Sequence, residues 1–357
     1  MANGSKYTLF VPQGEFEYLG ERFASIPRFL FRTWTPKTKG STSSTHVRSE
    51  AANNNTSTGD LFGRDLHSAR SMLKWHMLWK ELCNDNLTSW TSSIIFALQH
   101  GIRKSVAHTK VKEDASTIQI MILDTCDLPR GVFLSARDLL EAYDLTSDPD
   151  LEKKLQWYYG EYLSQGIMDL PASASVTVTL AQLENLGLRT LYSPSMYRFN
   201  DNALWLAVKD ARKEIKDALQ KRKEPTKKEI KTAQLIALTM TGRKKEKFRP
   251  VIMALLLTMK SRYRFEPMIL HAFKTNGWGQ YIEQAKLEHY STVTIDVPEH
   301  KQFVELMHLL QAQAQYARET ETTEEVAADQ VPDLTSGMRD LQTSWSGEYV
   351  KMVAQDF

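Results

Sequence analysis

Cysteine is scarce in this sequence, and its scarcity excludes two kinds of site. The 357 residues contain two cysteines, Cys83 and Cys126, and no C-x-x-C pair. We therefore expect neither a disulfide framework nor a cysteine-based zinc site, and a reduced compartment is favoured. The nine histidines show no metal-binding pattern, because His67 and His76 are too far apart to lie one helical turn from each other. We expect no metal.

Long apolar runs are also missing. The uninterrupted apolar run at residues 251–257 is far too short to span a bilayer. Residues 1–6 lack the apolar core of a secretory signal. The sequence thus predicts a cytoplasmic or nuclear protein with no signal peptide, no transmembrane segment and no membrane partner.

The net charge of +2 hides a strong segregation of charge along the chain. Residues 205–275 contain 19 Lys and Arg against 7 Asp and Glu, whereas residues 276–357 contain 5 against 14. Such blocks can attract each other within one molecule, or the basic block can face an anionic partner. Solvated helix faces are the interpretation that we favour. Nucleic-acid binding through residues 209–249 is a second one, which no zinc-finger spacing or RNA-recognition motif supports.

Strands and helices alternate irregularly up to about residue 200. Residues 28–34 and 117–123 are rich in aromatic and apolar side chains, which is typical of strands. Residues 65–84 have apolar side chains at helical spacing, and Ser92 or Ser93 can cap the next helix. Evenly spaced β-α-β units of a doubly wound sheet are not present, so the sequence predicts an α+β fold.

The chain divides by composition into three regions. We expect an α+β domain over residues 1–200, with a mobile loop at 36–60 where Ser, Thr, Asn, Gly and Lys dominate. Residues 201–320 read as a basic helical region, and residues 321–357 as an acidic flexible tail.

Arg32 stands among aromatic and apolar residues in the strand 28–34. A guanidinium is costly to bury without a partner. Arg32 therefore either holds a phosphate through its planar fork of donors, or is an edge-strand arginine that pairs with a local carboxylate or reaches solvent. Hydroxyls cluster at Ser89-Trp90-Thr91-Ser92-Ser93, just before an apolar helix. One hydroxyl suffices for an N-cap, and the surplus can orient a ligand or a nearby acid.

Glu161 forms the third motif, between Gly160 and Gly166 and after two tyrosines. Glycine allows the backbone to bend sharply there. Such a carboxylate can accept a hydrogen bond from a sugar hydroxyl and stabilise positive charge at an anomeric carbon, as carboxylates do in glycoside cleavage. The alternative is a surface glutamate near a turn.

In this order, the three motifs resemble the Arg, Ser-Thr-Ser and Glu signature of toxin-type mono-ADP-ribosyltransferases of the heat-labile enterotoxin branch. The strand 118–123 and the turn at 129–131 are similar to segments between the Ser and Glu motifs of that branch. The sequences of residues 28–32, 89–99 and 160–166 resemble those of an uncharacterised domain of filamentous-fungal proteins. The resemblance covers about residues 15–195 and implies an ADP-ribosyltransferase-like split β-sheet.

The resemblance also implies roles for individual residues, with NAD as substrate. Arg32 would hold the NAD phosphates and ribose, while Ser89, Thr91 and Ser92 would position Glu161 and the nicotinamide ribose. Glu161 would bind the ribose 2′-hydroxyl and stabilise the oxocarbenium-like state as nicotinamide leaves.

Tyr159 is the further residue that we expect to contact the dinucleotide. Members that modify arginine carry a second acid at this position, two residues before the catalytic glutamate, so the resemblance does not imply arginine as the acceptor. We expect an NAD-dependent mono-ADP-ribosyltransferase acting on a protein acceptor, or an NAD glycohydrolase. The alternative is a non-catalytic interaction protein on the same fold, whose basic helices bind a polyanion or a protein.

Overall fold

The structure is a computed structural model of the whole chain. The residues that it describes are 6–56, 58–80, 84–106, 112–152, 155, 160–192, 204–217, 224–262, 267–278, 281–282 and 297–329, without the side chains of 204–205, 217 and 321–329. The chain divides into two compact units, Met1–Ala312 and Gln313–Phe357.

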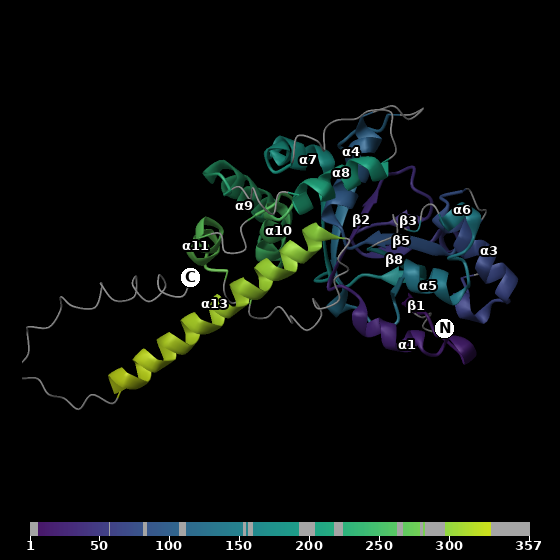
Figure 1. The fold of residues 1–357 in the computed structure, drawn as a ribbon, viewed down its shortest axis with the longest axis horizontal. Helices are drawn as coiled ribbons and strands as arrows, with labels where there is room; N and C mark the ends of the chain where they lie inside the picture. The colour runs from purple at the N-terminus through teal and green to yellow at the C-terminus, as the bar shows by residue number, and fades with distance from the viewer. Residues whose placement is uncertain are drawn as a thin grey trace, which may run out of the picture. The chain divides into compact units, whose positions relative to one another are not determined.

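The strands form one antiparallel sheet. Nine strands belong to it among the described residues, in the order β3-β4-β8-β5-β2-β6-β9, and β1 and β7 also pair with β8. Their bounds are β1 Tyr7–Thr8, β2 Phe29–Trp34, β3 Ser41–Thr42, β4 His46–Arg48, β5 Leu87–Thr91, β6 Gln119–Asp124, β7 Leu134–Ser135, β8 Glu161–Asp169 and β9 Ser175–Thr179. Together with the helices, this sheet confirms the α+β class (Figure 1).

The helices precede, interrupt and follow the strands. Their bounds are α1 Leu19–Arg22, α2 Glu50–Asn53, α3 Leu66–Met77, α4 Ile94–Ser105, α5 Ala136–Ala142, α6 Pro149–Glu152, α7 Leu180–Asn185, α8 Leu204–Asp217, α9 Lys227–Thr241, α10 Phe248–Leu257, α11 Pro267–Thr275 and α13 Pro298–Asp329. None of the described helices has the length and apolar character that crossing a membrane requires.

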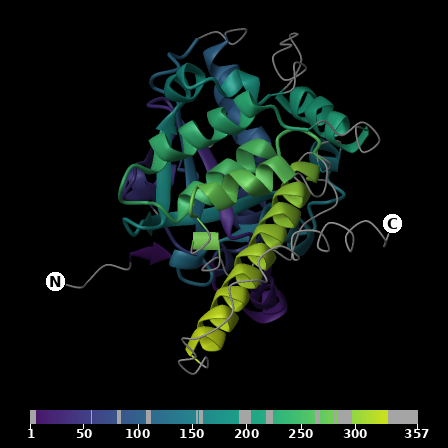
Figure 2. The same ribbon diagram turned by 90° about the vertical axis from the view of Figure 1, so that its left-hand side faces the viewer.

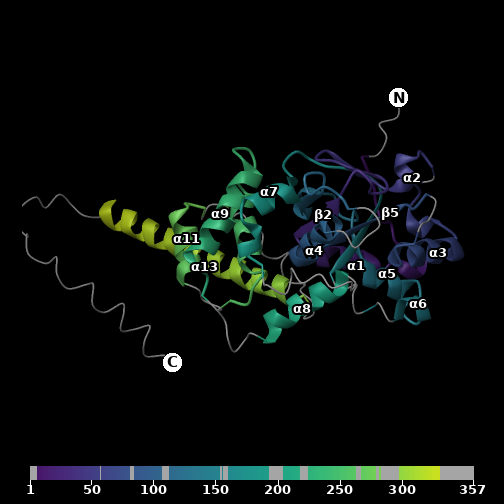
Figure 3. The same cartoon turned by 90° about the horizontal axis from the view of Figure 1, so that it is seen from above.

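Two groups of helices pack against different parts of the sheet. α3, α5 and α6 lie on one side, and α4, α9 and α10 lie on the other (Figures 1 and 3). Leu73 of α3 and Leu139 of α5 share a buried cluster with Leu163 of β8. In the second group, Val251 of α10 shares a buried cluster with Phe29 of β2, and α9 and α10 stand in front of the sheet in Figure 2.

The helices after residue 200 pack directly on the sheet. The ring of Phe29 lies 6.2 Å, centroid to centroid, from the rings of both Phe248 in α10 and Phe303 in the first half of α13. Residues 1–312 therefore form a single compact unit. The boundary expected near residue 200 lies within this unit.

Residues 36–60, expected to be a mobile loop, contain the hairpin of β3 and β4 and the short helix α2. The hairpin joins the sheet through β8. The apolar anchors of this segment are few: Val47, Ala51 and Ala52 are buried, and the Ser49 hydroxyl caps α2 by accepting from the Ala52 amide. Composition concealed these elements because three small apolar side chains are enough to hold them.

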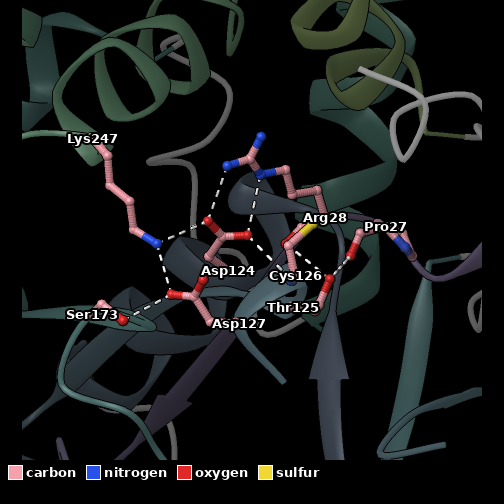
Figure 4. Close-up of polar contacts among 8 residues, drawn as sticks. All are labelled: Pro27, Arg28, Asp124, Thr125, Cys126, Asp127, Ser173 and Lys247. Atoms are coloured by element: carbon pink, nitrogen blue, oxygen red, sulfur yellow. Dashed lines mark hydrogen bonds and ion pairs between the residues drawn. The ribbon is translucent and has the colours of Figure 1, made fainter. Parts of the chain in front are cut away.

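A polar cluster ties the edge of the sheet to α10 (Figure 4). Asp124, at the end of β6, accepts from Arg28 Nε and Nη2, both at 3.1 Å, and from Lys247 Nζ at 3.2 Å. Lys247 also donates to Asp127 Oδ2 at 2.7 Å, and Ser173 Oγ donates to the same oxygen at 3.1 Å. Because Lys247 immediately precedes α10, this cluster joins the C-terminal helices to the strands by charge as well as by apolar contact.

Candidate active site

Arg32 bridges two strands that diverge. β2 pairs with β6 along its whole length, but with β5 only at Phe31 and Thr91. On the β5 side, Arg32 Nη1 donates to the carbonyl oxygen of Ser89 at 2.8 Å, and Nε donates to Thr42 Oγ1 in the hairpin at 3.2 Å. The side chain of Arg32 therefore supplies the link that backbone pairing does not.

The positive charge of Arg32 has no negative partner among the described residues. No described Asp or Glu lies within ion-pair distance of it, and no described residue accepts from its Nη2. Burial lowers the pKa of Arg32 to about 10, and its guanidinium carbon lies 5.8 Å from the Trp90 ring. Burying a cation without a counter-charge is costly. A planar fork held in place with free donors is suited to a phosphate or carboxylate group of a ligand.

Glu161 meets the same serine from the other side. Thr91 and Glu161 are register partners on β5 and β8, so Ser89 lies diagonally across from the glutamate on the same face. Ser89 Oγ donates to Glu161 Oε1 at 2.8 Å. Burial raises the pKa of Glu161, although the charge of His76 and the Ser89 hydrogen bond oppose the shift. A raised carboxyl pKa in a partly buried position is characteristic of functional acids.

His76 completes this arrangement, and sequence reasoning missed it. Its Nε2 lies 2.8 Å from Ser89 Oγ, and its Nδ1 lies 2.6 Å from Asp85 Oδ2. The sequence did contain a signal: His76 stands three residues after Leu73 and seven after Ala69, on the buried face of α3. A histidine on the apolar face of an amphipathic helix needs hydrogen-bond partners in the core.

Charge decides how the protons are shared. Burial alone would lower the pKa of His76, but the charge and hydrogen bond of Asp85, with the charge of Glu161, raise it above its ordinary value of 6.5. In the imidazolium, Nδ1–H donates to Asp85 and Nε2–H donates to Ser89 Oγ. The hydroxyl proton of Ser89 is then directed to Glu161. In neutral His76, with Nδ1–H still on Asp85, Nε2 accepts instead and draws that proton away from Glu161.

Asp85, His76 and Ser89 have the connectivity of a serine-nucleophile triad, but their charges do not suit one. A general base must be neutral to take the serine proton. Here the neighbouring carboxylates Asp85 and Glu161 favour the imidazolium, and the Ser89 hydroxyl already donates to Glu161. The arrangement is therefore suited to holding and orienting the Glu161 carboxylate.

The other hydroxyls of the Ser-rich motif serve the backbone. Thr91 Oγ1 accepts from the Ser93 amide at 3.1 Å, and Ser93 Oγ accepts from the Phe96 amide, capping α4. The Ser92 amide donates to the carbonyl oxygen of Gly160 at 2.8 Å. Thr91 and Ser92 thus shape the two turns beside Glu161, and Ser89 is the hydroxyl that contacts its carboxylate.

Helices α8 and α13 also help to hold the Ser-rich motif in place. Ser93 Oγ also donates to Glu299, a fully buried residue at the start of α13, and Arg212 Nε of α8 donates to the same carboxylate oxygen at 3.2 Å. Gly160 has a φ of +79°, and a Cβ there would lie 2.6 Å from Ser92 Oγ and 3.4 Å from Val297 Cγ2. Only glycine fits at this point, where the C-terminal part of the chain packs against the turn before Glu161.

Arg32 and Glu161 thus both contact Ser89 in the structure. The Ser89 carbonyl oxygen accepts from the guanidinium of Arg32, and the Ser89 hydroxyl donates to the carboxylate of Glu161. Tyr159, also expected at the site, lies outside the described residues. Within the described residues, no group of three His, Cys, Asp or Glu side chains is arranged to hold a metal ion.

Part of the chain matches a known family model. Residues 25–181 match a family model described as "Domain of unknown function (DUF7587)". The match covers less than half of the chain, but it includes Arg32, His76, Ser89 and Glu161. No curated protein and no solved structure matches the chain significantly.

Proposed function

We propose that this protein binds NAD and breaks the bond between nicotinamide and ribose, as a mono-ADP-ribosyltransferase or an NAD glycohydrolase. The proposal extends to the fold, in which the diverging strands β2 and β5 correspond to the split sheet of the ADP-ribosyltransferase family. One observation carries it: an arginine with no counter-charge among the described residues and a glutamate of raised pKa are both bound to Ser89, the first at its carbonyl and the second at its hydroxyl.

The chemistry assigned to each group follows from its contacts. Arg32, fixed by Thr42 and the Ser89 carbonyl, would direct its remaining donors to the diphosphate of NAD. Glu161, oriented by Ser89, would accept from the ribose 2′-hydroxyl and stabilise positive charge developing at the anomeric carbon. His76 would keep the Ser89 proton pointed at Glu161. A protein side chain as acceptor would give the transferase, and water would give the glycohydrolase.

Replacing Arg32 by lysine tests the diphosphate assignment. Lysine keeps the charge but loses the planar fork, and a hydrogen bond to a charged group contributes about 1.5–3 kcal/mol. We expect Arg32→Lys to weaken NAD binding roughly tenfold to a hundredfold. Calorimetric titration of NAD measures the affinity, and chromatography of released nicotinamide measures turnover, with the exposed Arg137→Lys as control.

Two outcomes of this experiment count against the proposal in different ways. Wild-type protein that neither binds NAD nor releases nicotinamide refutes the proposed function. Equal affinities of the wild type and Arg32→Lys refute only the role of Arg32.

The rate of nicotinamide release should depend on pH in a bell shape. Activity needs ionised Glu161. Because the pKa of Glu161 is raised above the ordinary glutamate value of 4.5, the rate should fall on the acid side at a pH above 4.5. It also needs protonated His76, whose raised pKa puts the alkaline limb above 6.5.

In His76→Gln the alkaline limb should vanish. The acid limb should move to higher pH, because the charge of His76 lowers the pKa of Glu161. His67→Gln, exposed on the same helix, should keep both limbs, and a His76→Gln profile identical to that of the wild type would contradict the assignment.

The alternative function is a non-catalytic interaction protein whose basic helices bind a polyanion or a protein. The exposed lysines Lys227, Lys228 and Lys231 at the start of α9 support it. Other members of the basic block, such as Arg212 and Lys247, are used in ion pairs within the chain. This function predicts no nicotinamide release, together with binding to nucleic acid that weakens steeply as salt is added.

A further inference from the structure

Trp79 occupies a backbone position that disfavours tryptophan. It follows Leu78, the C-cap residue of α3, with its amide donating to the His76 carbonyl and the Lys80 amide donating to the Trp75 carbonyl. The φ of Trp79 is +53°, in the left-handed region that helices usually close with glycine. Its side chain is 59% exposed, so burial of the indole does not compensate for this strain. Local strain that folding does not repay often marks a functional position.

Among the described residues, the Trp79 indole has His100 as its aromatic neighbour. Its ring lies 5.7 Å from that of His100 in α4, at an angle of 30°, and His100 in turn lies 6.4 Å from Phe96. Burial, with the charges of Lys104 and Arg32, lowers the pKa of His100 to about 3. Neutral His100 is therefore a flat partner that supports one face of Trp79 without adding charge.

This aromatic pair lies beside the candidate active site. Trp79 is three residues beyond His76, whose imidazole reaches Ser89. His100 is three residues beyond Ala97, whose carbonyl accepts from Thr33 Oγ1 of β2 at 2.7 Å, and the charge of Arg32 contributes to the lowered pKa of His100. The Trp79–His100 pair therefore joins the end of α3 to α4, next to the two strands that carry Ser89 and Arg32.

We propose that Trp79 is a stacking platform for a heteroaromatic base of a nucleotide whose phosphate is held by Arg32. The inference rests on the proposed function and adds to it a residue that binds the substrate base. Both ends of NAD carry such a base, and their shared chemistry is a planar ring joined through ribose to phosphate. Stacking on an aromatic side chain is sequence-tolerant, because every base offers a π-face.

The backbone of Trp79 makes a sharp test available. Trp79→Gly relieves the left-handed strain, so its melting temperature should equal or exceed that of the wild type. Its Kd for NAD should nevertheless rise about tenfold to a hundredfold. Trp79→Phe should keep most of the affinity. Tyr18→Ala, which removes an exposed aromatic side chain from just before α1, should leave the Kd unchanged.

Calorimetric titrations with NAD, AMP and nicotinamide mononucleotide identify the base, since only the nucleotide that stacks should lose affinity in Trp79→Gly. KM for NAD should rise with Kd while kcat changes little. Wild-type binding and cleavage of NAD together with an unchanged Kd in Trp79→Gly would overturn the inference and leave the proposed function intact. Wild-type protein that neither binds nor cleaves NAD would overturn both.

Discussion

Glu161→Gln should lower the rate of nicotinamide release about 10²-fold or more, while leaving the protein folded and able to bind NAD. Removing one group that stabilises transition-state charge typically costs on this scale, or several kcal/mol. Glutamine has the shape of glutamate and can still accept from Ser89, but it carries no charge to stabilise an oxocarbenium-like state. NAD affinity should stay within a few-fold of the wild type, since Arg32 is untouched.

The stability of Glu161→Gln separates catalysis from folding. Burial raises the pKa of Glu161, which means that the folded state disfavours the ionised form. Above that pKa the charge therefore opposes folding, and the neutral isostere should not lower the free energy of unfolding at pH 7 by more than about 1 kcal/mol. Such a combination of lost activity and kept stability is typical of functional sites.

Single-turnover release of nicotinamide, with urea unfolding of the same samples, measures both effects. Glu141→Gln, an exposed glutamate in α5, is the matched control and should behave as wild type. A Glu161→Gln variant that keeps more than about a third of the wild-type rate would rule out Glu161 as the stabilising carboxylate.

Asp124→Ala should have the largest effect on stability, with a loss of about 3–5 kcal/mol in the free energy of unfolding. Asp124 is 1% exposed and accepts from both Arg28 and Lys247 (Figure 4). Removing the carboxylate leaves two cations close together without the charge that both contact. The cost of an uncompensated buried charge is the reason for the large effect.

Urea unfolding followed by circular dichroism measures this loss. Asp127→Ala provides the contrast, because Asp127 also binds Lys247 but its side chain is 28% exposed and more strongly screened by water. It should cost about 1 kcal/mol or less. Equal losses for the two variants would show that burial of Asp124 is not what makes the cluster important.

Local patterns predicted the elements well where a helix or strand has its own signal. Within the region expected to be helical, α9 begins and ends where local signals stand, because Thr226 and Glu229 form a capping box and Gly242 follows the last turn. The strand expected at 117–123 is β6, Gln119–Asp124, an almost fully buried strand. In residues 36–60 the same approach failed, since the hairpin there depends on pairing with β8, more than a hundred residues away.

The sequence by itself determined the α+β class, the helices and strands with strong periodicity, and the three motifs on which the proposal of NAD cleavage is based. These properties follow from side chains near one another in the chain. Only the tertiary structure decided that Arg32 and Glu161 meet at Ser89, that His76 of α3 sets the direction of the Ser89 proton, and that Glu299 reaches Ser93 from the C-terminal helices. Those contacts depend on strand register and helix packing between distant segments, which hydrophobic period does not encode.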